Sequence, residues 1–304
     1  MAKFRSNHAK QGAKGGGTTA VRVGLFGAII AGLFFAFSKF IGGEDGNTDD
    51  SYFPSEENTN YADAYFLPSS SKGQLVEHEY YWLSYVEEHE QAEWVAYTLT
   101  REQIEQKWVE RPDLFLPDPA IRSQSATPDD YYRSGYDRGH LVPAADRAFS
   151  KEAIEETFLM SNISPQAHSF NGGIWRELEE LTRSWAKKYK KLYVVTGPVF
   201  SMPAKGRIGD NEVTIPAAYF KVILDASEPE LKGIGFIMPN EISYEPVFKY
   251  ATSIDEIERL TGLNFFNDLL DRELEEELES SYNIDLWQFN KAKFEKRINK
   301  WNNN

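Results

Sequence analysis

The sequence predicts an α+β protein built on a largely antiparallel sheet. Strand-forming segments, rich in β-branched and aromatic residues and bounded by glycine or proline, span residues 92–100, 191–200, 215–224 and 233–240. Helix-forming segments span residues 150–160, 173–189 and 253–270. The two kinds of segment do not alternate as regular βαβ units, which favours the α+β class over a parallel sheet.

Local patterns support the individual elements. The segment 92–100 alternates and is rich in β-formers, polar helix formers follow at 101–108, and a proline-broken loop occupies 110–121. The helix expected at 173–189 carries one apolar stripe, formed by Ile174, Leu178, Leu181 and Trp185. The charged run 271–281 predicts a solvated helix.

The composition supports a sizeable core and excludes cysteine chemistry. Of 304 residues, 41% are apolar and 14% are aromatic, which argues against a wholly disordered chain. The chain has no cysteine, so disulfides and thiolate metal sites are excluded. The formal charge of −14 disfavours tight non-specific nucleic-acid binding, which relies on lysine and arginine. A nuclease remains allowed, because it needs only a local positive site and must release its product.

The N-terminal part predicts a membrane anchor. Residues 1–22 are a basic leader without acids, and residues 23–37 form a charge-free apolar run. Extended to 23–42, the run has about the 20-residue length of a transmembrane helix. The basic leader favours a cytoplasmic N-terminus, so we expect a single-pass anchor with the catalytic domain on the extracytoplasmic side. The alternatives are secretion through a cleaved signal peptide and a buried core helix.

A linker should separate this anchor from the folded domain. Residues 43–72 are rich in Gly, Ser, Asn and acids, which is typical of a flexible acidic tether. An irregular leading strand is the alternative for residues 65–68. Residues 73–304 are expected to form the folded domain.

Most familiar catalytic motifs are missing. The sequence has no G-x-S-x-G, no P-loop and no G-x-G-x-x-G. The stretch that starts at His89 resembles a zincin motif, but Glu93 occupies the position of the second histidine. His78 and His89 lie among glutamates, where a solvated face is the simpler interpretation.

His140 is the strongest catalytic candidate. It lies in DRGHLVPAAD (137–146), and SNISPQAHSFNGGIWRELEE (161–180) follows. Phosphodiester hydrolysis needs a base for water, a cation for the developing charge and an acid for the leaving oxygen. His140 could be the base, while Arg138, two residues away on the same side of an extended segment, could hold a phosphate. Asn171 offers a hard oxygen for Mg²⁺, which keeps several waters and takes few protein ligands.

Together these motifs resemble the DNA/RNA non-specific endonucleases, the endonuclease G-like, sugar-non-specific nucleases. The resemblance rests on D-R-G-H and on the N-x8-N-x7-E spacing of Asn162, Asn171 and Glu179, and it covers roughly residues 75–270. It implies a ββα-metal (His-Me finger) site and a Mg²⁺-dependent hydrolysis of DNA and RNA. Mn²⁺ is expected to substitute for Mg²⁺, and a homodimer is compatible with the family.

The resemblance also implies roles for the residues that match. His140 would be the general base, Asn171 the direct protein ligand of Mg²⁺, and Glu179 would orient the waters of the ion. Arg138 would contact the phosphate, and Asn162 would support the site. Asp137 would anchor the turn and not touch the substrate. Arg111, whose match to the family is looser, would stabilise charge in the transition state. The segment 140–144 would be the strand that presents the histidine.

Each role has a plain structural alternative. His140 could be satisfied inside a hairpin, and Asn171 could be a helix N-cap. Glu179 could pair with Arg183 at i,i+4 on the helix surface, and Glu177 and Glu180 compete for its role. Lys221 could lie on a face of the sheet, or it could contact the substrate. For the whole chain, the alternative is a catalytically inactive nuclease fold that acts as a membrane-tethered binding or scaffold module. A third, narrower alternative is a site-specific or effector nuclease with a dedicated inhibitor.

Overall fold

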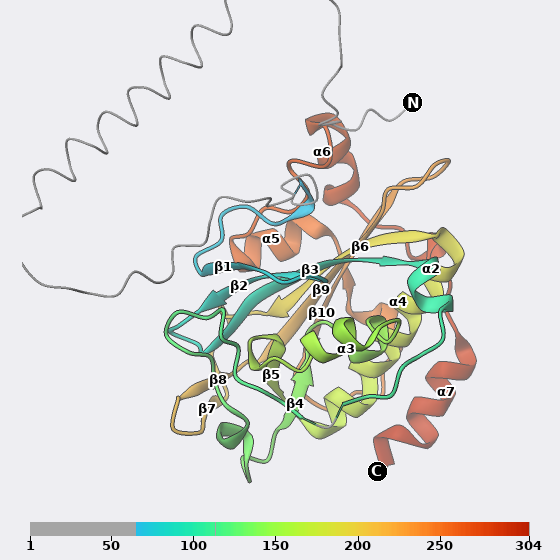
Figure 1. The fold of residues 1–304 in the computed structure, drawn as a ribbon. Coiled ribbons are helices and arrows are strands. Elements are labelled where there is room, and N and C mark those ends of the chain that lie inside the picture. The colour runs from blue at the N-terminus through green and yellow to red at the C-terminus, as the bar shows by residue number, and fades with distance from the viewer. Residues whose placement is uncertain (1–64, 113, 304) are drawn as a thin grey trace, which may run out of the picture. The chain divides into compact units, whose positions relative to one another are not determined.

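The computed structural model describes residues 65–112 and 114–303. A seven-stranded antiparallel sheet lies at its centre, with the order β1-β2-β3-β6-β9-β10-β11 (Figure 1). The sheet strands are β1 (Gln74–Glu77), β2 (Trp82–Val86), β3 (Gln91–Thr100), β6 (Lys191–Pro198), β9 (Ala218–Asp225), β10 (Lys232–Pro239) and β11 (Ala251–Thr252). Two hairpins stand apart from it, β4 (Asp137–His140) with β5 (Ile163–Gln166) and β7 (Gly206–Ile208) with β8 (Val213–Ile215).

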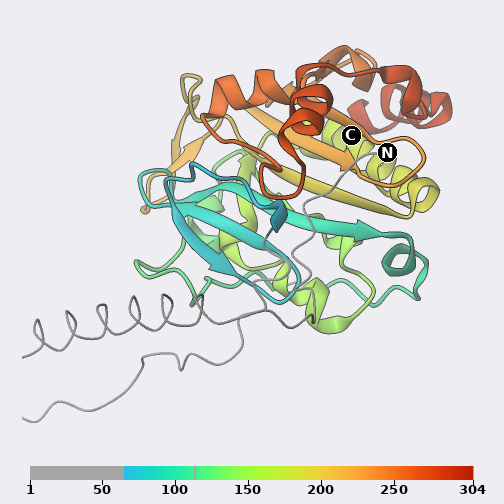
Figure 2. The ribbon, with the colours of Figure 1, turned by 90° about the horizontal axis from the view of Figure 1, so that it is seen from above.

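Helices cover both faces of this sheet. The α-helices are α2 (Arg101–Glu105), α3 (Lys151–Glu156), α4 (Arg176–Tyr189), α5 (Ile254–Thr261), α6 (Arg272–Ser280) and α7 (Lys291–Asn299). The shorter helical turns are η2 (Pro128–Tyr131), η3 (Ala144–Asp146), η4 (Met160–Asn162), η5 (Phe170–Trp175), η6 (Val247–Tyr250), η7 (Ile284–Leu286) and η8 (Trp301–Asn303). Figure 2 shows the orange and red C-terminal segments gathered beside the β9–β10 half of the sheet, away from the blue β1.

Alternate side chains along β3 point to opposite faces of the sheet and so belong to two separate core clusters. On β3, Val95 and Tyr97 join the cluster that contains the α4 stripe, whereas Trp94 and Ala96 join the cluster under α5. This is the period of two expected of a strand that is buried on both sides. The predicted apolar stripe packs as expected, with Leu178, Leu181 and Trp185 of α4 buried together with Ile174, which lies in η5 before α4 begins at Arg176. The catalytic motifs therefore lie on the opposite face of the sheet from α5 and α6, whereas α7 pairs with α4.

The predicted α+β class and antiparallel sheet are confirmed, and the differences concern element ends. The helix expected over 253–270 ends at Thr261, because Gly262 takes a left-handed conformation that terminates it. The helix expected over 150–160 ends at Glu156. A helix forms within 271–281, but it is not wholly solvated, since Leu278 and Glu279 are buried.

At the N-terminal end, ordered structure precedes residue 73. Phe66 is buried in the core, and Ser69 pairs with Asn264 through backbone hydrogen bonds. Residues 65–72 thus pack onto the domain, in line with the alternative of a leading segment. The predicted anchor, residues 23–42, lies outside the described residues. Among the described helices, none combines the length and apolarity needed to cross a bilayer.

Candidate active site

A hairpin followed by a helix brings the two sequence motifs together. β4 pairs antiparallel with β5, with Arg138 opposite Pro165 and His140 opposite Ile163. The chain then passes through η5 into α4, giving a β–β–α arrangement on the α4 face of the sheet. Gly139 is required here, because a Cβ at this position would overlap the buried side chain of Gln166. The strand itself is DRGH, so the expectation that 140–144 forms it was wrong: β4 ends at His140.

His140 is held between two aromatic rings. The imidazole lies 5.6 Å from the ring of Phe115 and 4.8 Å, edge to face, from that of Phe158. Its Nε2 is shielded from solvent and has no hydrogen-bond partner among the described residues. Burial, and secondarily the charge of Arg111, lower the pKa of His140 to about 3. The imidazole is therefore neutral near pH 7, and its Nε2, unpartnered within the described part of the chain, distinguishes it from the satisfied histidine of the structural alternative.

Two arginines stack on the same pair of rings. The Arg138 guanidinium lies 4.4 Å from the Phe115 ring centroid, and that of Arg111 lies 5.1 Å from the Phe158 centroid. Cation–π contact of this kind orients a guanidinium while its N–H groups stay available. Arg111, whose motif match was loose, is thus brought to the same place as His140.

Asn162 is fully buried and supports the backbone beyond His140. Its Oδ1 accepts from the backbone N–H of Val142 at 2.8 Å, and its Nδ2 donates to the carbonyls of Val142 (3.1 Å) and Thr157 (2.9 Å). With its amide engaged in this way, Asn162 is a positioning residue and not one that touches reacting atoms.

Asn171 is tied to β4 through Asp137. The Asn171 Nδ2 donates to Asp137 Oδ2 at 2.9 Å, which leaves the amide oxygen for a ligand. The same carboxylate lies 3.0 Å from Nδ1 of His168. Asn171 does not cap a helix, since Ser169 precedes η5 and Trp175 precedes α4. Asp137 therefore orients the predicted ligand, a more specific task than the turn anchor we expected.

The acids that compete with Glu179 on α4 are engaged elsewhere. Glu177 forms a buried ion pair with Arg297, and Glu180 pairs with Lys293 at 2.8 Å. Arg183, the expected i,i+4 partner of Glu179, binds Asp146 at 2.8 Å instead. Glu177 and Glu180 are therefore not available for the role predicted for Glu179.

A buried lysine lies in the electrostatic field of Glu179. Lys221, on β9, is fully buried, and its ammonium lies 4.8 Å from the Trp175 ring centroid without a hydrogen bond to any described residue. Burial raises the pKa of Glu179, while Arg183 and Lys221 oppose that rise. Burial lowers the pKa of Lys221, and Glu179 opposes it. Of the two options for Lys221, the structure shows the sheet face, directed toward α4.

Sequence reasoning missed several contributors. Phe115 and Phe158 gave no signal of their own, because apolar residues in a loop and a helix are ordinary core candidates. The aromatic pair becomes visible only when residues 43 positions apart meet around His140. Lys221 stands out in the sequence, because a lysine amid apolar strand residues is unusual. Its position near Glu179 depends on how β9 packs against α4.

Comparison with known proteins agrees with the sequence motifs. A family model described as DNA/RNA non-specific endonuclease matches residues 58–272. Human mitochondrial endonuclease G is 35% identical over 221 residues, which cover 68% of this chain and 74% of that protein. The mitochondrial nuclease EXOG of Xenopus laevis is 37% identical over 171 residues, 51% of this chain and about half (48%) of that protein.

The fold agrees as well. A crystal structure of the EndoG/EndoGI complex, which concerns inhibition of EndoG, superposes with a TM-score of 0.64 at 31% identity, covering 71% of this chain and 94% of that one. The chain is therefore a nuclease enzyme. More specifically, it belongs to the DNA/RNA non-specific endonuclease family.

Proposed function

We propose that the protein is a Mg²⁺-dependent endonuclease that hydrolyses phosphodiester bonds in both DNA and RNA through a ββα-metal site. The observation that carries this proposal is the neutral His140 imidazole, whose Nε2 has no hydrogen-bond partner among residues 65–112 and 114–303. It is set between two aromatic rings that each hold an arginine. A base without a competing partner beside two phosphate-binding groups suits attack on a phosphodiester.

His140 acts as the general base in this proposal. Its neutral imidazole takes a proton from the water that attacks phosphorus. The two flanking rings fix the plane of the imidazole.

Asn171 and Glu179 fit a divalent metal ion. The Asn171 amide is oriented by Asp137 so that a neutral oxygen is left over, and Mg²⁺ commonly keeps most of its waters beside one or two protein oxygens. Glu179, kept near two cationic side chains, can accept hydrogen bonds from such waters. When bound, Mg²⁺, or Mn²⁺ in its place, would neutralise negative charge that develops on the leaving oxygen.

The arginines bind the substrate in this scheme. Arg138 holds a phosphate oxygen, and Arg111 approaches the charge that develops on the phosphoryl group in the transition state. Asn162 keeps the backbone after His140 in place, so its loss should act through the position of the imidazole.

We also propose that residues 23–42 anchor the protein in a membrane with the nuclease domain outside the cytoplasm. The apolar run and its basic leader support this topology. Protease added to intact cells should then remove the domain. Protection in intact cells and in spheroplasts alike would overturn this orientation.

A cleavage assay tests the enzymatic proposal. The full chain should cut supercoiled plasmid and single-stranded RNA with Mg²⁺ and should fail to cut either with EDTA. His140→Ala should be inactive, while the control His89→Ala, which removes an imidazole stacked on Phe200 away from the hairpin, should cut normally. Nucleic-acid binding without cleavage by the wild type would favour the inactive scaffold module instead.

A further inference from the structure

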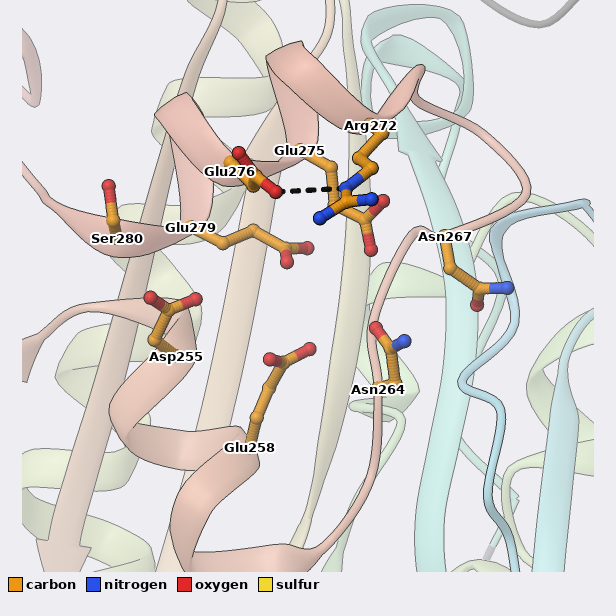
Figure 3. A pocket seen from close by; sticks show the side chains of 9 residues that line it. All are labelled: Asp255, Glu258, Asn264, Asn267, Arg272, Glu275, Glu276, Glu279 and Ser280. Atoms are coloured by element: carbon orange, nitrogen blue, oxygen red, sulfur yellow. Dashed lines mark hydrogen bonds and ion pairs between the residues drawn. The ribbon is translucent and has the colours of Figure 1, made fainter.

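An acidic cavity lies on the opposite face of the sheet from His140, between α5 and α6. Its volume is about 520 Å³, and its lining consists of Asp255, Glu258, Asn264, Asn267, Arg272, Glu275, Glu276, Glu279 and Ser280. Figure 3 shows these side chains converging from the two helices and from the loop that joins them. Five carboxylates and one guanidinium therefore line a single cavity.

Three of these carboxylates are spaced for one shared ligand. Asp255 and Glu258 stand one turn apart on α5, and Glu279 reaches toward them from α6 (Figure 3). One oxygen from each lies within 4.8 Å of the others. Glu258 is held in place because its Oε1 accepts from the backbone N–H of Phe265 at 2.8 Å.

Glu279 points to a ligand independently of this cluster. Its side chain is buried, with 3% of the residue exposed, and its Oε1 has no hydrogen-bond partner among the described residues. The nearby guanidinium does not compensate it, because Arg272 pairs with Glu276 at 3.0 Å. A buried carboxyl among acids and without a cation is costly unless something positive joins it.

We propose that Asp255, Glu258 and Glu279 bind a divalent cation of the calcium type. The donors are hard carboxylate oxygens, and neither histidine nor cysteine lines the cavity, which disfavours zinc. Ca²⁺ accepts six to eight oxygens in flexible geometry, so three carboxylates and waters in a roomy cavity suit it better than they suit Mg²⁺.

The ion would fasten the two helices to each other and to the sheet. α5 and α6 approach β10 closely: a Cβ at Gly233 would lie 2.8 Å from Ile254 Cδ1 and 3.1 Å from the carbonyl of Leu278. The proposed ligands Asp255 and Glu279 directly follow these two contact residues in the chain. A cation between them would hold both contacts together, a structural role separate from catalysis.

The thermal midpoint of the full chain, measured with Ca²⁺ or EDTA, tests this site. At a Ca²⁺ concentration about one hundred times the dissociation constant, the midpoint should rise by about 5 °C. Glu279→Gln should abolish the rise, as should Asp255→Asn, which changes an exposed residue and should leave folding intact. Glu277→Gln, an exposed control on α6, should retain it.

Two further measurements distinguish this site from the catalytic site and Ca²⁺ from Mg²⁺. Asn171→Ala should keep the full rise, and Mg²⁺ should need at least tenfold higher concentrations than Ca²⁺. If Ca²⁺ did not raise the thermal midpoint of the wild type, or raised that of Glu279→Gln equally, the proposed cation site would be refuted. An equal response to Mg²⁺ would overturn its assignment to calcium.

Discussion

Two glutamates on opposite faces of the sheet both have a pKa raised by burial, but their neighbours carry opposite charges. Glu179, on α4, lies near Arg183 and Lys221, whose charges favour its ionised form. Glu279, on α6, lies near Glu258, Glu275 and Asp255, which all disfavour ionisation. Burial raises both pKa values, and the neighbours then decide whether the carboxyl can serve as an anion.

Positive side chains of the protein itself compensate Glu179, whereas Glu279 would need a cation from solution. On the α4 face, the cations come from the protein itself, so Glu179 can accept hydrogen bonds from metal-bound waters as part of catalysis. On the α5–α6 face, the charges that act on Glu279 come from acids, and Arg272 is paired with Glu276, so a bound cation would complete the site. Substitutions on the two faces should therefore affect different properties.

The largest expected contrast is in activity. His140→Ala should lower kcat/KM for plasmid cleavage by about 10²–10⁴, the usual contribution of a general base. Glu279→Gln should leave kcat/KM within about twofold, because it lies across the sheet from the hairpin. Steady-state cleavage rates at saturating Mg²⁺ measure both, and comparable losses in the two variants would abolish the separation of faces.

A second contrast concerns metal dependence. Glu179→Gln should raise the Mg²⁺ concentration needed for half-maximal cleavage, or lower the rate, by about 10–100-fold, as is typical when a group that orients metal-bound waters is lost. Glu180→Gln, one residue away and paired with Lys293, is the matched control. If Glu180→Gln had the larger effect, the assignment of Glu179 would be wrong.

The link between Asp137 and Asn171 should give an effect of about tenfold. Asp137→Ala removes the acceptor that orients the Asn171 amide, so Mg²⁺ activation should weaken by about that factor. Asp137→Asn should restore part of the activity, because an amide oxygen can still accept the bond. Mg²⁺ titrations of the three proteins test this, and unchanged activation in Asp137→Ala would refute the orienting role.

The last contrast is in the pH dependence of stability, measured in EDTA. The pKa of Glu279 is raised to about 9, so the folded state keeps a proton that the unfolded state releases, and stability falls as pH rises from about 4.5 to 9. The pKa of His140 is lowered to about 3, so stability falls as pH drops from about 6.5 to 3. Each slope is at most about 1.4 kcal/mol per pH unit.

Denaturant unfolding across pH 4–9 distinguishes these two contributions. Glu279→Gln should remove the fall in stability above about pH 4.5, and His140→Ala the fall below about pH 6.5, so that only the ranges above 6.5 and below 4.5 report one group alone. A Glu279→Gln profile that parallels the wild type from pH 5 to 9 would show that the buried carboxyl does not titrate as described.

Much of the fold and half of the site could be predicted from local patterns. The strands over 92–100 and 191–200 and the α4 stripe were visible because alternation and helical spacing are local properties. His140, Asn171 and Glu179 could be found because D-R-G-H and the N-x8-N-x7-E spacing are short and specific. Their placement on one hairpin–helix unit follows from chain proximity.

The rest depends on contacts between distant segments. No local pattern shows that Phe115 and Phe158 enclose His140, or that Asp137 binds Asn171 from 34 positions away. The run 271–281 predicted a solvated helix, and only its packing against β10 and α5 buries Glu279 among other acids. Buried charge is a property of the assembled fold, so composition alone cannot locate it.

Metal-dependent cleavage by the full chain tests the central claim most directly. Wild type, His140→Ala and Asn171→Ala are incubated with supercoiled plasmid and with RNA, in Mg²⁺ and in EDTA. We expect the wild type alone to convert plasmid to nicked and linear forms and to degrade RNA, and only with Mg²⁺. Cleavage by His140→Ala at the wild-type rate, or wild-type cleavage that persists in EDTA, would contradict the proposed mechanism.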